Sequence, residues 1–480
     1  MIDKKKISET FRFPFGSRDN GIVYFIGIGG IGMSAIARFF KAKGTTVSGY
    51  DKTRTELTDQ LVKESIEVHF TEDVSMVPSS PDLVVYTPAI PEDNKELIHC
   101  REKGFKVVKR SDVLEIITAS SFNICIAGTH GKTTITTMVA HLLRSSGFGC
   151  NAFLGGIAVN YNTNFWSDDK NVCVVEADEY DRSFLKLHPD IAVITAMDAD
   201  HLDIYGTETA MEEAFIDFAK NVQYGGMLIT KFGLEHTSAL QAGKSKENAI
   251  TYSLQNDSAE VYASNIKLDN GGYEFDVNLP DKKIESLHLE MGGMHNVENA
   301  LAAISIAASL GIDEDKIKSG ISSFKGVRRR FEYLIKNDTL VFIDDYAHHP
   351  EELRAVITGA KTLFRGKRCT VIFQPHLFSR TRDLAKEFGE ALDLADEVVL
   401  LPIYPARELP VEGVTSDIIL ASMNKKNKSV INKPDLIKWI NTEYVKNINR
   451  EFGAILITAG AGDIDTMVQP IMNELKEIRA

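Results

Sequence analysis

A glycine-rich turn carries the residue types that bind nucleotide phosphates. It reads Gly128-Thr129-His130-Gly131-Lys132-Thr133-Thr134 and follows the apolar run 124–127. A strand that leads through a tight turn into a helix directs backbone N–H groups at one point, which favours an anion there. Lys132 is expected to neutralise the β- and γ-phosphates, and the Thr133 hydroxyl to bind Mg²⁺. The first glycine of the usual G-x-x-x-x-G-K-[ST] pattern is absent at Ile126. An ordinary turn before a surface lysine therefore stays an alternative.

A second glycine loop lies near the N-terminus, between a predicted strand at 21–26 and a predicted helix at 33–43. It reads Gly27-Ile28-Gly29-Gly30-Ile31-Gly32, which is a G-x-G-x-x-G pattern. Asp51 stands roughly 20 residues further on, at the end of the predicted strand 46–50, where dinucleotide-binding folds place a ribose-binding acid. Alone, this loop predicts a nicotinamide-dependent dehydrogenase, or only close packing of helix against strand. Because hydride transfer needs neither ATP nor Mg²⁺, the two loops together favour a nucleotide-linked substrate, such as a UDP-sugar, beside ATP.

Two acidic clusters follow predicted strands further along the chain. They are Glu176-Ala177-Asp178-Glu179 and Asp198-Ala199-Asp200-His201-Leu202-Asp203. In a parallel sheet both would lie at the edge that carries the phosphate loop, where carboxylate oxygens can complete the coordination of Mg²⁺. Each cluster alone could equally be a solvated acidic turn, and His201 a surface histidine.

Composition limits the class of protein. The 480 residues are enough for about three domains, and 44% hydrophobic with 25% charged residues is typical of a globular chain. A net charge of −13 argues against general nucleic-acid binding. The five cysteines are odd in number and lack Cys-x-x-Cys spacing, so neither a disulfide framework nor a zinc site is expected. The sequence shows no signal peptide and no apolar run long enough for a membrane span, so a cytoplasmic protein is predicted.

The hydrophobic pattern divides the chain into three α/β regions. Short apolar strands alternate with helical patterns in the first region, at 23–25, 46–50, 68–70, 83–86 and 106–109. A short polar stretch, 119–123, separates it from the second region, whose predicted strands are 172–176, 191–195 and 226–230. Between 249 and 291 the pattern changes to alternation with Asn-Gly-Gly punctuation, which predicts added antiparallel strands, and a helix at 296–310 follows. After the basic stretch 328–331, the third region has predicted strands at 340–344, 369–373, 397–401 and 454–458.

In their order along the chain, these motifs resemble the Mur ligases, ATP-dependent amide-forming enzymes of peptidoglycan synthesis. The resemblance also covers His295-Asn-Val-Glu-Asn299, Arg329-Arg-Phe331, Asp344-Asp-Tyr-Ala-His-His-Pro350 and Gln374-Pro-His376. It implies a Rossmann-like UDP-N-acetylmuramate-binding domain at 1–118. It further implies a central P-loop ATPase domain with added antiparallel strands at 119–326 and a Rossmann-like, amino-acid-binding domain at 327–480.

The resemblance implies roles for individual residues. For ATP these are Gly128, Thr129, Gly131, Lys132, Thr133, Thr134, Asn296, Asn299, Arg330 and Asp345. For Mg²⁺ they are Thr133, Glu176 and His201. For the UDP-sugar they are Gly27, Gly29, Gly30, Ile31, Gly32, Asp51, His69, Thr87 and His130. For catalysis they are Lys132, Glu176, His201, His348, His376 and Arg380.

Within the family, the motifs favour the branch that adds alanine. The expected reaction is ATP-dependent ligation of L-alanine to UDP-N-acetylmuramate through an acyl phosphate, an early cytoplasmic step of peptidoglycan synthesis. Related ligases carry a carbamylated lysine in the stretch that matches 212–217, which has none here. Two departures stand out: Tyr180 replaces a frequent serine, and Leu377 replaces a frequent arginine, which removes a cation from the expected amino-acid pocket.

Three alternatives remain at this point. A sister ligase adds a recycled murein tripeptide to the same UDP-sugar with the same loops. A dehydrogenase would change nicotinamide absorbance without using ATP, and a nucleotide sensor would bind both nucleotides without turnover. The expected partners are small-molecule substrates, with no nucleic acid and no membrane, for a monomer or homodimer.

Overall fold

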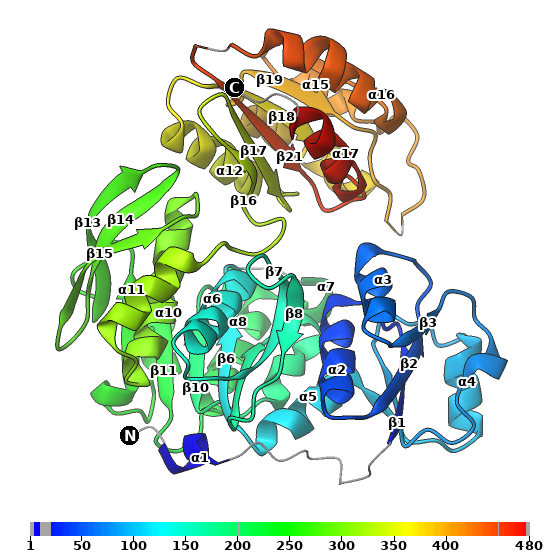
Figure 1. The fold of residues 1–480 in the computed structure, drawn as a ribbon, viewed down its shortest axis with the longest axis vertical. Coiled ribbons are helices and arrows are strands. Elements are labelled where there is room, and N and C mark those ends of the chain that lie inside the picture. Colours follow the sequence, from blue (N-terminus) through cyan, green and yellow to red (C-terminus); the bar gives the residue numbers. More distant parts are fainter. Residues whose placement is uncertain (1–3, 10–20, 199–201, 407, 450, 477–480) are drawn as a thin grey trace. The chain divides into compact units, whose positions relative to one another are not determined.

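The computed structural model describes residues 4–9, 21–198, 202–406, 408–449 and 451–476. The chain divides into two compact units, whose elements are labelled in Figure 1. The first unit comprises residues 1–265, 275–287 and 298–324, and the second comprises 266–274, 288–297 and 325–480. Three sheets form the framework of the described chain.

The first sheet is a five-stranded parallel sheet with the order β3-β2-β1-β4-β5. Its strands are β1 (Ile22–Ile26), β2 (Thr46–Tyr50), β3 (Glu67–His69), β4 (Leu83–Tyr86) and β5 (Val107–Lys109). The helices of this region are α2 (Ile31–Ala42), α3 (Glu56–Lys63), α4 (Lys95–Glu102) and α5 (Arg110–Ala119). The predicted Rossmann-like arrangement is confirmed. Because the strand order reverses beside β1, a ligand crevice is expected at the carboxyl ends of β1, β2 and β4.

The second sheet has ten strands, in the order β15-β14-β13-β12-β11-β10-β6-β9-β7-β8. They are β6 (Phe122–Ala127), β7 (Asn151–Ala158), β8 (Thr163–Trp166), β9 (Val172–Glu176), β10 (Ile191–Ile194), β11 (Met227–Lys231), β12 (Ala249–Ser253), β13 (Val261–Asp269), β14 (Gly272–Asn278) and β15 (Lys283–Leu289). The helices of the same stretch are α6 (Lys132–Ser145), α7 (Leu202–Tyr205), α8 (Glu208–Lys220), α9 (Thr237–Leu240), α10 (Met294–Ser309) and α11 (Glu314–Ser323). The strands from β12 to β7 pair in parallel, and β8 closes the edge antiparallel to β7.

Three details of this region differ from the sequence prediction. The stretch 119–123 is not a linker, because β6 begins at Phe122 and both Phe122 and Asn123 are buried. The first pair of the added strands is parallel rather than antiparallel, since Tyr252 of β12 lies in parallel register with Val261 of β13. The β7–β8 hairpin was not predicted, because Gly155 and the glycine after it interrupt the apolar pattern of β7.

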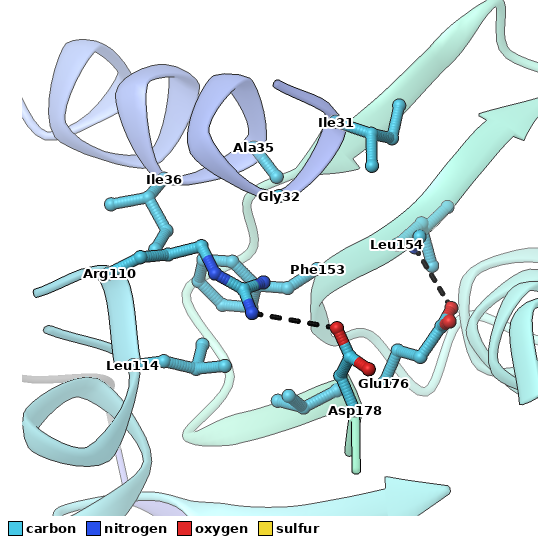
Figure 2. A pocket seen from close by; sticks show the side chains of 12 residues that line it. Ile31, Gly32, Ala35, Ile36, Arg110, Leu114, Phe153, Leu154, Glu176 and Asp178 are labelled. Carbon is cyan, nitrogen blue, oxygen red and sulfur yellow. Dashed lines mark hydrogen bonds and ion pairs between the residues drawn. The ribbon is translucent and has the colours of Figure 1, made fainter. Parts of the chain in front are cut away.

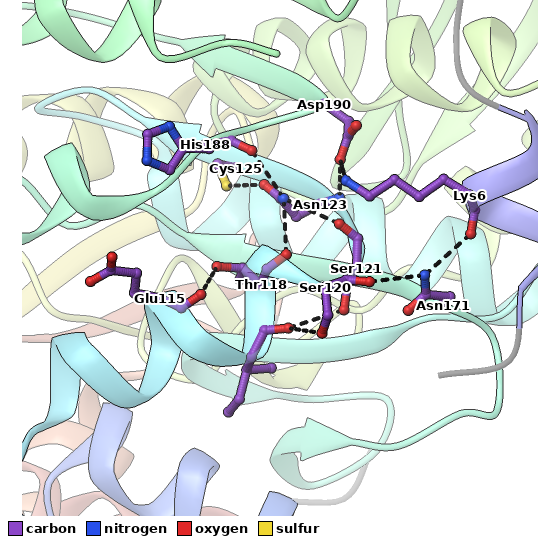
Figure 3. Close-up of polar contacts among 11 residues, drawn as sticks. Lys6, Glu115, Thr118, Ser120, Ser121, Asn123, Cys125, Asn171, His188 and Asp190 are labelled. Carbon is purple, nitrogen blue, oxygen red and sulfur yellow. Dashed lines mark hydrogen bonds and ion pairs between the residues drawn. The ribbon is translucent and has the colours of Figure 1, made fainter. Parts of the chain in front are cut away.

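The amino-terminal ends of β6 and β9 are held by a polar network together with helix α1 (Lys4–Ser8), as Figure 3 shows. The Lys6 ammonium contacts the Asp190 carboxylate at 2.7 Å, and the backbone N–H of Asn123 donates to the same oxygen at 2.9 Å. The Asn171 amide donates to the carbonyl oxygens of Lys6 and Ser120, both at 3.2 Å. Because the phosphate loop follows the carboxyl end of β6, this network fixes the edge opposite to that loop.

Aromatic packing joins the two sheets of the first unit. Phe39 of α2 packs against Phe153 of β7 and Phe165 of β8, with ring centroids 5.6 and 6.1 Å apart. All three rings belong to one hydrophobic cluster that also contains residues of β1 and β6. The helix that follows the first glycine loop is therefore packed directly on the sheet that carries the second loop.

The second unit is built on a six-stranded sheet with the order β16-β17-β21-β18-β19-β20. Its strands are β16 (Glu332–Lys336), β17 (Leu340–Asp345), β18 (Arg368–Phe373), β19 (Glu397–Leu400), β20 (Lys428–Val430) and β21 (Ala454–Ala459). Its longer helices are α12 (Pro350–Leu363), α13 (Phe378–Asp383), α14 (Ala385–Leu392), α15 (Asp417–Ser422), α16 (Lys433–Trp439) and α17 (Asp465–Lys476). The third α/β region is confirmed, although β16 and β20 were not predicted. Alternate residues of β17 enter different hydrophobic clusters, with Val341 in one and Phe342 in the other, as expected for a sheet covered on both faces.

Among the described residues, no helix is both long enough and apolar enough to cross a membrane.

Candidate functional site

The phosphate loop lies between β6 and α6, as predicted. Gly128 has φ 124°, and a Cβ atom there would lie 2.1 Å from the Thr195 Oγ1, so the backbone passes where only glycine fits. Gly131, with φ 78°, is the N-cap of α6, and no side chain caps this helix start. The first N–H groups of α6 are thus directed at the loop, which is the arrangement that binds phosphate.

Lys132, the first residue of α6, is held by two oxygen atoms. Its ammonium donates to the Gly128 carbonyl oxygen at 2.6 Å and to the Glu179 Oε1 at 2.7 Å. Glu179 is 1% exposed, and this burial raises the pKa of its carboxyl, while the charge of Lys132 opposes the rise. Its Oε2 is also buried and has no hydrogen-bond partner in the described part of the chain. The pair therefore leaves one buried oxygen of Glu179 unsatisfied.

Thr133 and Glu176 form an oxygen cluster beside the lysine. The Thr133 hydroxyl donates to the Glu176 Oε1 at 3.0 Å, and the Gly155 N–H donates to the Glu176 Oε2 at 3.1 Å. Glu176 is the last residue of β9, so the prediction that it lies at a strand end next to the loop is confirmed. A hydroxyl and a carboxylate at this separation are hard oxygen ligands of the type that Mg²⁺ prefers. The residues present thus fit a nucleotide with its metal.

Other predicted residues lie on or beside the same loop. The Thr129 N–H donates to the Ala196 carbonyl oxygen at 3.1 Å, and Thr134 is buried in the first turn of α6. The His130 ring is largely exposed, with its Nε2 3.4 Å from the Asp198 Oδ2. His130 therefore belongs to the phosphate loop and does not contact the first glycine loop among the described residues. His201, predicted as a metal ligand, lies outside the described residues.

The two predicted asparagines of α10 have different surroundings. A Cβ atom on Gly131 would lie 2.7 Å from the Asn299 Oδ1, so Asn299 lies beside the phosphate loop in the first unit. The Asn296 amide is buried in the second unit and donates to the Gly292 carbonyl oxygen at 2.7 Å.

The first glycine loop connects β1 to α2, as predicted, with Gly30 as the N-cap and Ile31 and Gly32 as the first helical residues. Asp51, which follows β2, accepts the Gly29 N–H at 2.8 Å through its Oδ2. The acid thus supports the loop itself, with its Oδ1 accepting the N–H of Thr53 at 3.0 Å.

Thr87 and His69 border the same region of the first sheet. Thr87 follows β4, and its Cγ2 would lie 3.3 Å from a Cβ atom on Gly27. His69 is the last residue of β3 and is in register with Tyr50 of β2. The sheet therefore brings these two predicted residues to the edge that carries the first glycine loop.

A cavity of about 100 Å³ lies between α2, α5, the middle of β7 and the end of β9 (Figure 2). Its lining includes Ile31 and Gly32, from the helix start of the first loop, and Glu176, from the oxygen cluster beside the second. Arg110 lies at its wall, with its Nη2 3.7 Å from the Asp178 Oδ2. The cavity thus joins the helix start of the first loop to the carboxylate that contacts Thr133, and its wall holds a cation that the sequence analysis did not single out.

In the second unit, Arg330 and Asp345 lie close to Tyr346. The Arg330 guanidinium stands 5.2 Å from the centre of the Tyr346 ring. The Asp345 carboxylate accepts the backbone N–H groups of Phe331 and Ala347, both at 2.7 Å. Burial raises the pKa of Asp345 to about 6, although Arg330 and these two bonds act in the opposite direction.

The predicted histidines of the second unit also lie together. The rings of His348 and His376 are 6.1 Å apart, and the His376 ring stacks on Tyr404 at 5.8 Å. Burial lowers the pKa of His348 and lowers that of His376 to about 4, so both rings are neutral near pH 7. The His348 Nδ1 lies 3.0 Å from the Tyr346 carbonyl oxygen and must donate to it, which leaves a lone pair at Nε2.

Two buried nitrogen atoms in this cluster have no partner in the described chain. They are the His376 Nδ1 and the Arg380 Nη1. A buried guanidinium N–H without an acceptor is costly, and it indicates a place where an anionic group binds. Leu377, at the position where the resemblance suggests arginine, has φ 70° and precedes α13. Arg380 therefore supplies a cation to this cluster despite the leucine.

Sequence reasoning missed the partners that hold these residues. Arg110 follows β5 and looks like a surface arginine, and Tyr346 and Tyr404 were not assigned roles. The motif at 344–350 offered a signal for Tyr346 because it lies between Asp345 and His348. No local signal could have identified Arg110, since the cavity forms between segments distant in sequence.

Comparison with known protein families covers nearly the whole chain. Three family models match: "Mur ligase family, catalytic domain" at 22–122, "Mur ligase middle domain" at 126–307 and "Mur ligase, glutamate ligase domain" at 329–462. A UDP-N-acetylmuramate–L-alanine ligase of Porphyromonas gingivalis is 47% identical over 462 residues, which are 95% of this chain and 99% of the relative.

Two solved structures have a similar fold. The UDP-N-acetylmuramate-alanine ligase of Thermotoga maritima matches with a TM-score of 0.80 and 30% identity, over 95% of this chain and 99% of that one. A murein peptide ligase of Psychrobacter arcticus matches with a TM-score of 0.66 and 22% identity, over 96% and 100% of the two chains, and shares the fold alone.

Proposed function

Because the chain belongs to the Mur ligase family, we propose that it joins L-alanine to UDP-N-acetylmuramate at the expense of ATP. The observation that carries this proposal is the cavity in Figure 2, which is lined by Ile31 and Gly32 of the first loop and by Glu176, the carboxylate that accepts the Thr133 hydroxyl after the second loop. A ligase of this kind must bring a carboxylate on a nucleotide-linked substrate to the γ-phosphate of ATP. In the proposed arrangement, the loop at 27–32 binds the diphosphate of the UDP-sugar, and the loop at 128–131 binds ATP.

The cavity fits the part of the substrate that must pass between the loops. It is small, and its walls combine apolar side chains with the guanidinium of Arg110. We assign it to the lactyl arm of the muramate, whose terminal carboxylate would be attracted by Arg110 inside the cavity that Glu176 also lines. The ion pair of Arg110 with Asp178 is long, at 3.7 Å, so a substrate carboxylate could compete for the same guanidinium.

The chemistry of the first step follows from the residues around the second loop. A carboxylate oxygen of the substrate attacks the γ-phosphorus, and the bond between the γ-phosphorus and the oxygen that bridges to the β-phosphate breaks. ADP is the leaving group, and the muramate now carries an acyl phosphate. Lys132 would balance negative charge on the transferred phosphoryl group, and we assign the same task to Arg330, while Asp345 would belong to the same ATP site. Thr133, Glu176 and the undescribed His201 would hold Mg²⁺, which supplies positive charge to the phosphate oxygens when bound.

The second step needs a neutral amine. The alanine nitrogen attacks the acyl carbon, phosphate leaves, and the nitrogen loses a proton. His348 and His376 are suited to take that proton, because burial lowers their pKa values and each has a nitrogen lone pair. Arg380, with its unpartnered Nη1, would bind the carboxylate of the incoming amino acid.

The nearest alternative product would come from the murein tripeptide, which a sister ligase adds to the same sugar. The 47% identity to an alanine-adding enzyme, against 22% to a solved murein peptide ligase, supports alanine. The reaction consumes cytoplasmic nucleotides, so we propose a cytoplasmic enzyme that needs no nucleic-acid or membrane partner.

The test is phosphate release by the purified chain with ATP, Mg²⁺ and UDP-N-acetylmuramate, with and without L-alanine. Release that requires both the sugar and alanine is the expected result. Release with the tripeptide but not with alanine would move the chain to the sister activity. No release with either acceptor, while both nucleotides bind, would favour a nucleotide sensor.

A further inference from the structure

A fully buried carboxylate lies beneath the nucleotide side of the first sheet. Glu96, in the first turn of α4, is 0% exposed. Its Oε2 accepts the Tyr24 hydroxyl at 2.5 Å, and its Oε1 accepts the Asp73 N–H at 2.8 Å. The same Oε1 lies 2.9 Å from the His69 Nε2. No step of the proposed reaction uses this carboxylate, yet it makes three directed polar contacts.

These contacts decide which nitrogen of His69 carries the proton. The Tyr24 hydroxyl donates to Glu96, and burial together with that bond raises the pKa of Tyr24, so the phenol keeps its proton. The Tyr24 oxygen also lies 3.3 Å from the His69 Nε2, and it can only accept there. Both oxygen atoms around Nε2 are thus acceptors, and Nε2 must be the N–H donor. In the neutral tautomer that carries its proton on Nε2, the lone pair lies on Nδ1.

His69 is placed where a nucleoside base would lie. It ends β3, next to β2, whose end carries Asp51, and the Asp51 N–H donates to the His69 carbonyl oxygen at 3.1 Å. In doubly wound sheets, a nucleotide bound at the loop after β1 extends its ribose and base over the ends of the neighbouring strands. The His69 side chain is 15% exposed, and its Nδ1 has no hydrogen-bond partner in the described part of the chain.

We propose that Glu96 is a positioning residue that makes the His69 Nδ1 a hydrogen-bond acceptor for the base of the nucleotide substrate, which selects uracil over cytosine. This inference rests on the proposed function, which supplies a UDP-linked substrate. Uracil has an imide N–H at N3 that can donate to Nδ1. Cytosine has a lone pair at N3, so that two acceptors would face each other. A site built around one specific hydrogen bond rejects the analogue that cannot make it.

The first experiment measures binding of UDP and CDP to the full-length protein by calorimetry. The wild type is expected to bind UDP about tenfold more tightly than CDP, the effect of about one hydrogen bond to a prearranged acceptor. Glu96→Gln, whose amide can donate to Nε2 and reverse the ring, should lose that preference with little change for CDP. Glu102→Gln, an exposed acid of the same helix, is the matched control and should behave as the wild type.

A double-mutant cycle distinguishes an effect of Glu96 on the orientation of His69 from a general loss of structure. If Glu96 acts through His69, then His69→Ala and the double variant should bind UDP equally weakly. Turnover should show a raised KM for the UDP-sugar, with kcat and the KM for ATP unchanged. Additive losses, or equal losses for UDP and CDP, would overturn the proposal.

A second measurement needs no change at Glu96 and covers the case in which that variant fails to fold. Nitrogen-15 NMR of histidine-labelled wild-type protein, with His69 assigned from the missing signal of His69→Gln, reports the tautomer directly. The expected result is a protonated Nε2 and an unprotonated Nδ1 near pH 7.5. A protonated Nδ1, in either a neutral or a charged ring, would refute the inference. Neither measurement requires turnover, so failure of the alanine-dependent reaction with an intact UDP preference would count against the proposed function alone.

Discussion

The two glycine loops of the first unit follow the same plan, but different side chains support them. Each follows a strand inside a parallel sheet and begins a helix. The loop at 27–32 has no lysine, and the Asp51 carboxylate beside it accepts a backbone N–H of the loop. The loop at 128–131 is followed by Lys132 and Thr133, and a carboxylate contacts each of them. The first loop is therefore a backbone cradle, and the second carries charges.

This difference matches the fate of the phosphates that we assign to each loop. The diphosphate of a UDP-sugar is bound but unchanged, so backbone N–H groups and a helix start are sufficient. The γ-phosphate of ATP is transferred, and its changing charge needs a cation and a metal at fixed positions. Glu179 and Glu176 hold Lys132 and Thr133 near their working positions. Changes at the second loop should accordingly affect turnover, and changes at the first loop should affect substrate binding.

The largest effect is expected for Lys132→Met. Loss of the cation that balances the transferred phosphoryl group should lower kcat by about a thousandfold or more. UDP binding, measured by calorimetry, should stay within about twofold of the wild type. Lys220→Met removes an exposed lysine that pairs with Asp217, and it serves as the control. An equal loss of UDP affinity in Lys132→Met would show that the two loops are not separate in function.

A smaller effect is expected for Thr133→Val, which removes one proposed metal ligand and keeps the shape of the side chain. The concentration of Mg²⁺ needed for half-maximal phosphate release should rise by about 10- to 100-fold. Thr137→Val is the matched control, because Thr137 lies one turn further along α6 and its hydroxyl donates to the Thr133 carbonyl oxygen at 2.7 Å. Equal Mg²⁺ requirements in the two variants would remove Thr133 from the metal site.

The sequence was sufficient to predict what depends on local signals. Both loops, the alternation of strands and helices in the first domain and the strand ends that carry Glu176 and Asp51 follow from apolar runs that stop at glycine or acidic residues. The edge hairpin could not be predicted, because Gly155 is required by a distant residue: a Cβ atom there would lie 2.1 Å from the Glu176 Oε2. A glycine that serves tertiary packing looks in sequence like a strand breaker.

The supporting partners were the least predictable part of the candidate site. Glu96 lies in the first turn of a short helix, where an acid is favoured by the helix dipole and is usually exposed. Only the folded sheet shows that Tyr24 and His69 enclose it. The contact between Lys132 and Glu179 spans 47 positions of the chain, so spacing could indicate two functional groups but not that they form a pair.

A moderate effect is expected when the support of the first loop is removed. Asp51→Ala takes away the acceptor of the Gly29 N–H and should raise the KM for the UDP-sugar by about five- to tenfold, with kcat unchanged. Asp51→Asn keeps an oxygen acceptor and should have less effect. Asp59→Asn alters a half-buried acid on α3 that pairs with Arg54, and it is the control. A fall in kcat without a change in KM would contradict the role that we assign to the first loop.

The smallest effect concerns the stability of the charged pair at the second loop. Burial raises the pKa of Glu179, so the folded protein holds a proton on this carboxyl more readily than the unfolded chain does. The protonated Glu179 carboxyl therefore makes its full contribution to the free energy of unfolding at a pH below its pKa in the unfolded chain. This contribution is lost as the pH rises through its higher pKa in the folded protein. Relative to Glu179→Gln, the wild type should become less stable as the pH is raised above about 4.5, the ordinary value for this carboxyl.

Urea unfolding of the full chain between about pH 4.5 and pH 7.5 tests this difference, with Trp439→Phe as the background so that Trp166 of β8 reports on the first unit. Glu213→Gln, at an exposed position of α8, should show no such pH-dependent difference from the wild type. If the difference in the free energy of unfolding between Glu179→Gln and the wild type stays constant across this pH range, Glu179 has the same pKa in the folded and unfolded states. Burial of Glu179 beside Lys132 would then cost the folded protein no electrostatic free energy. The two loops would differ only in the side chains that contact the phosphates.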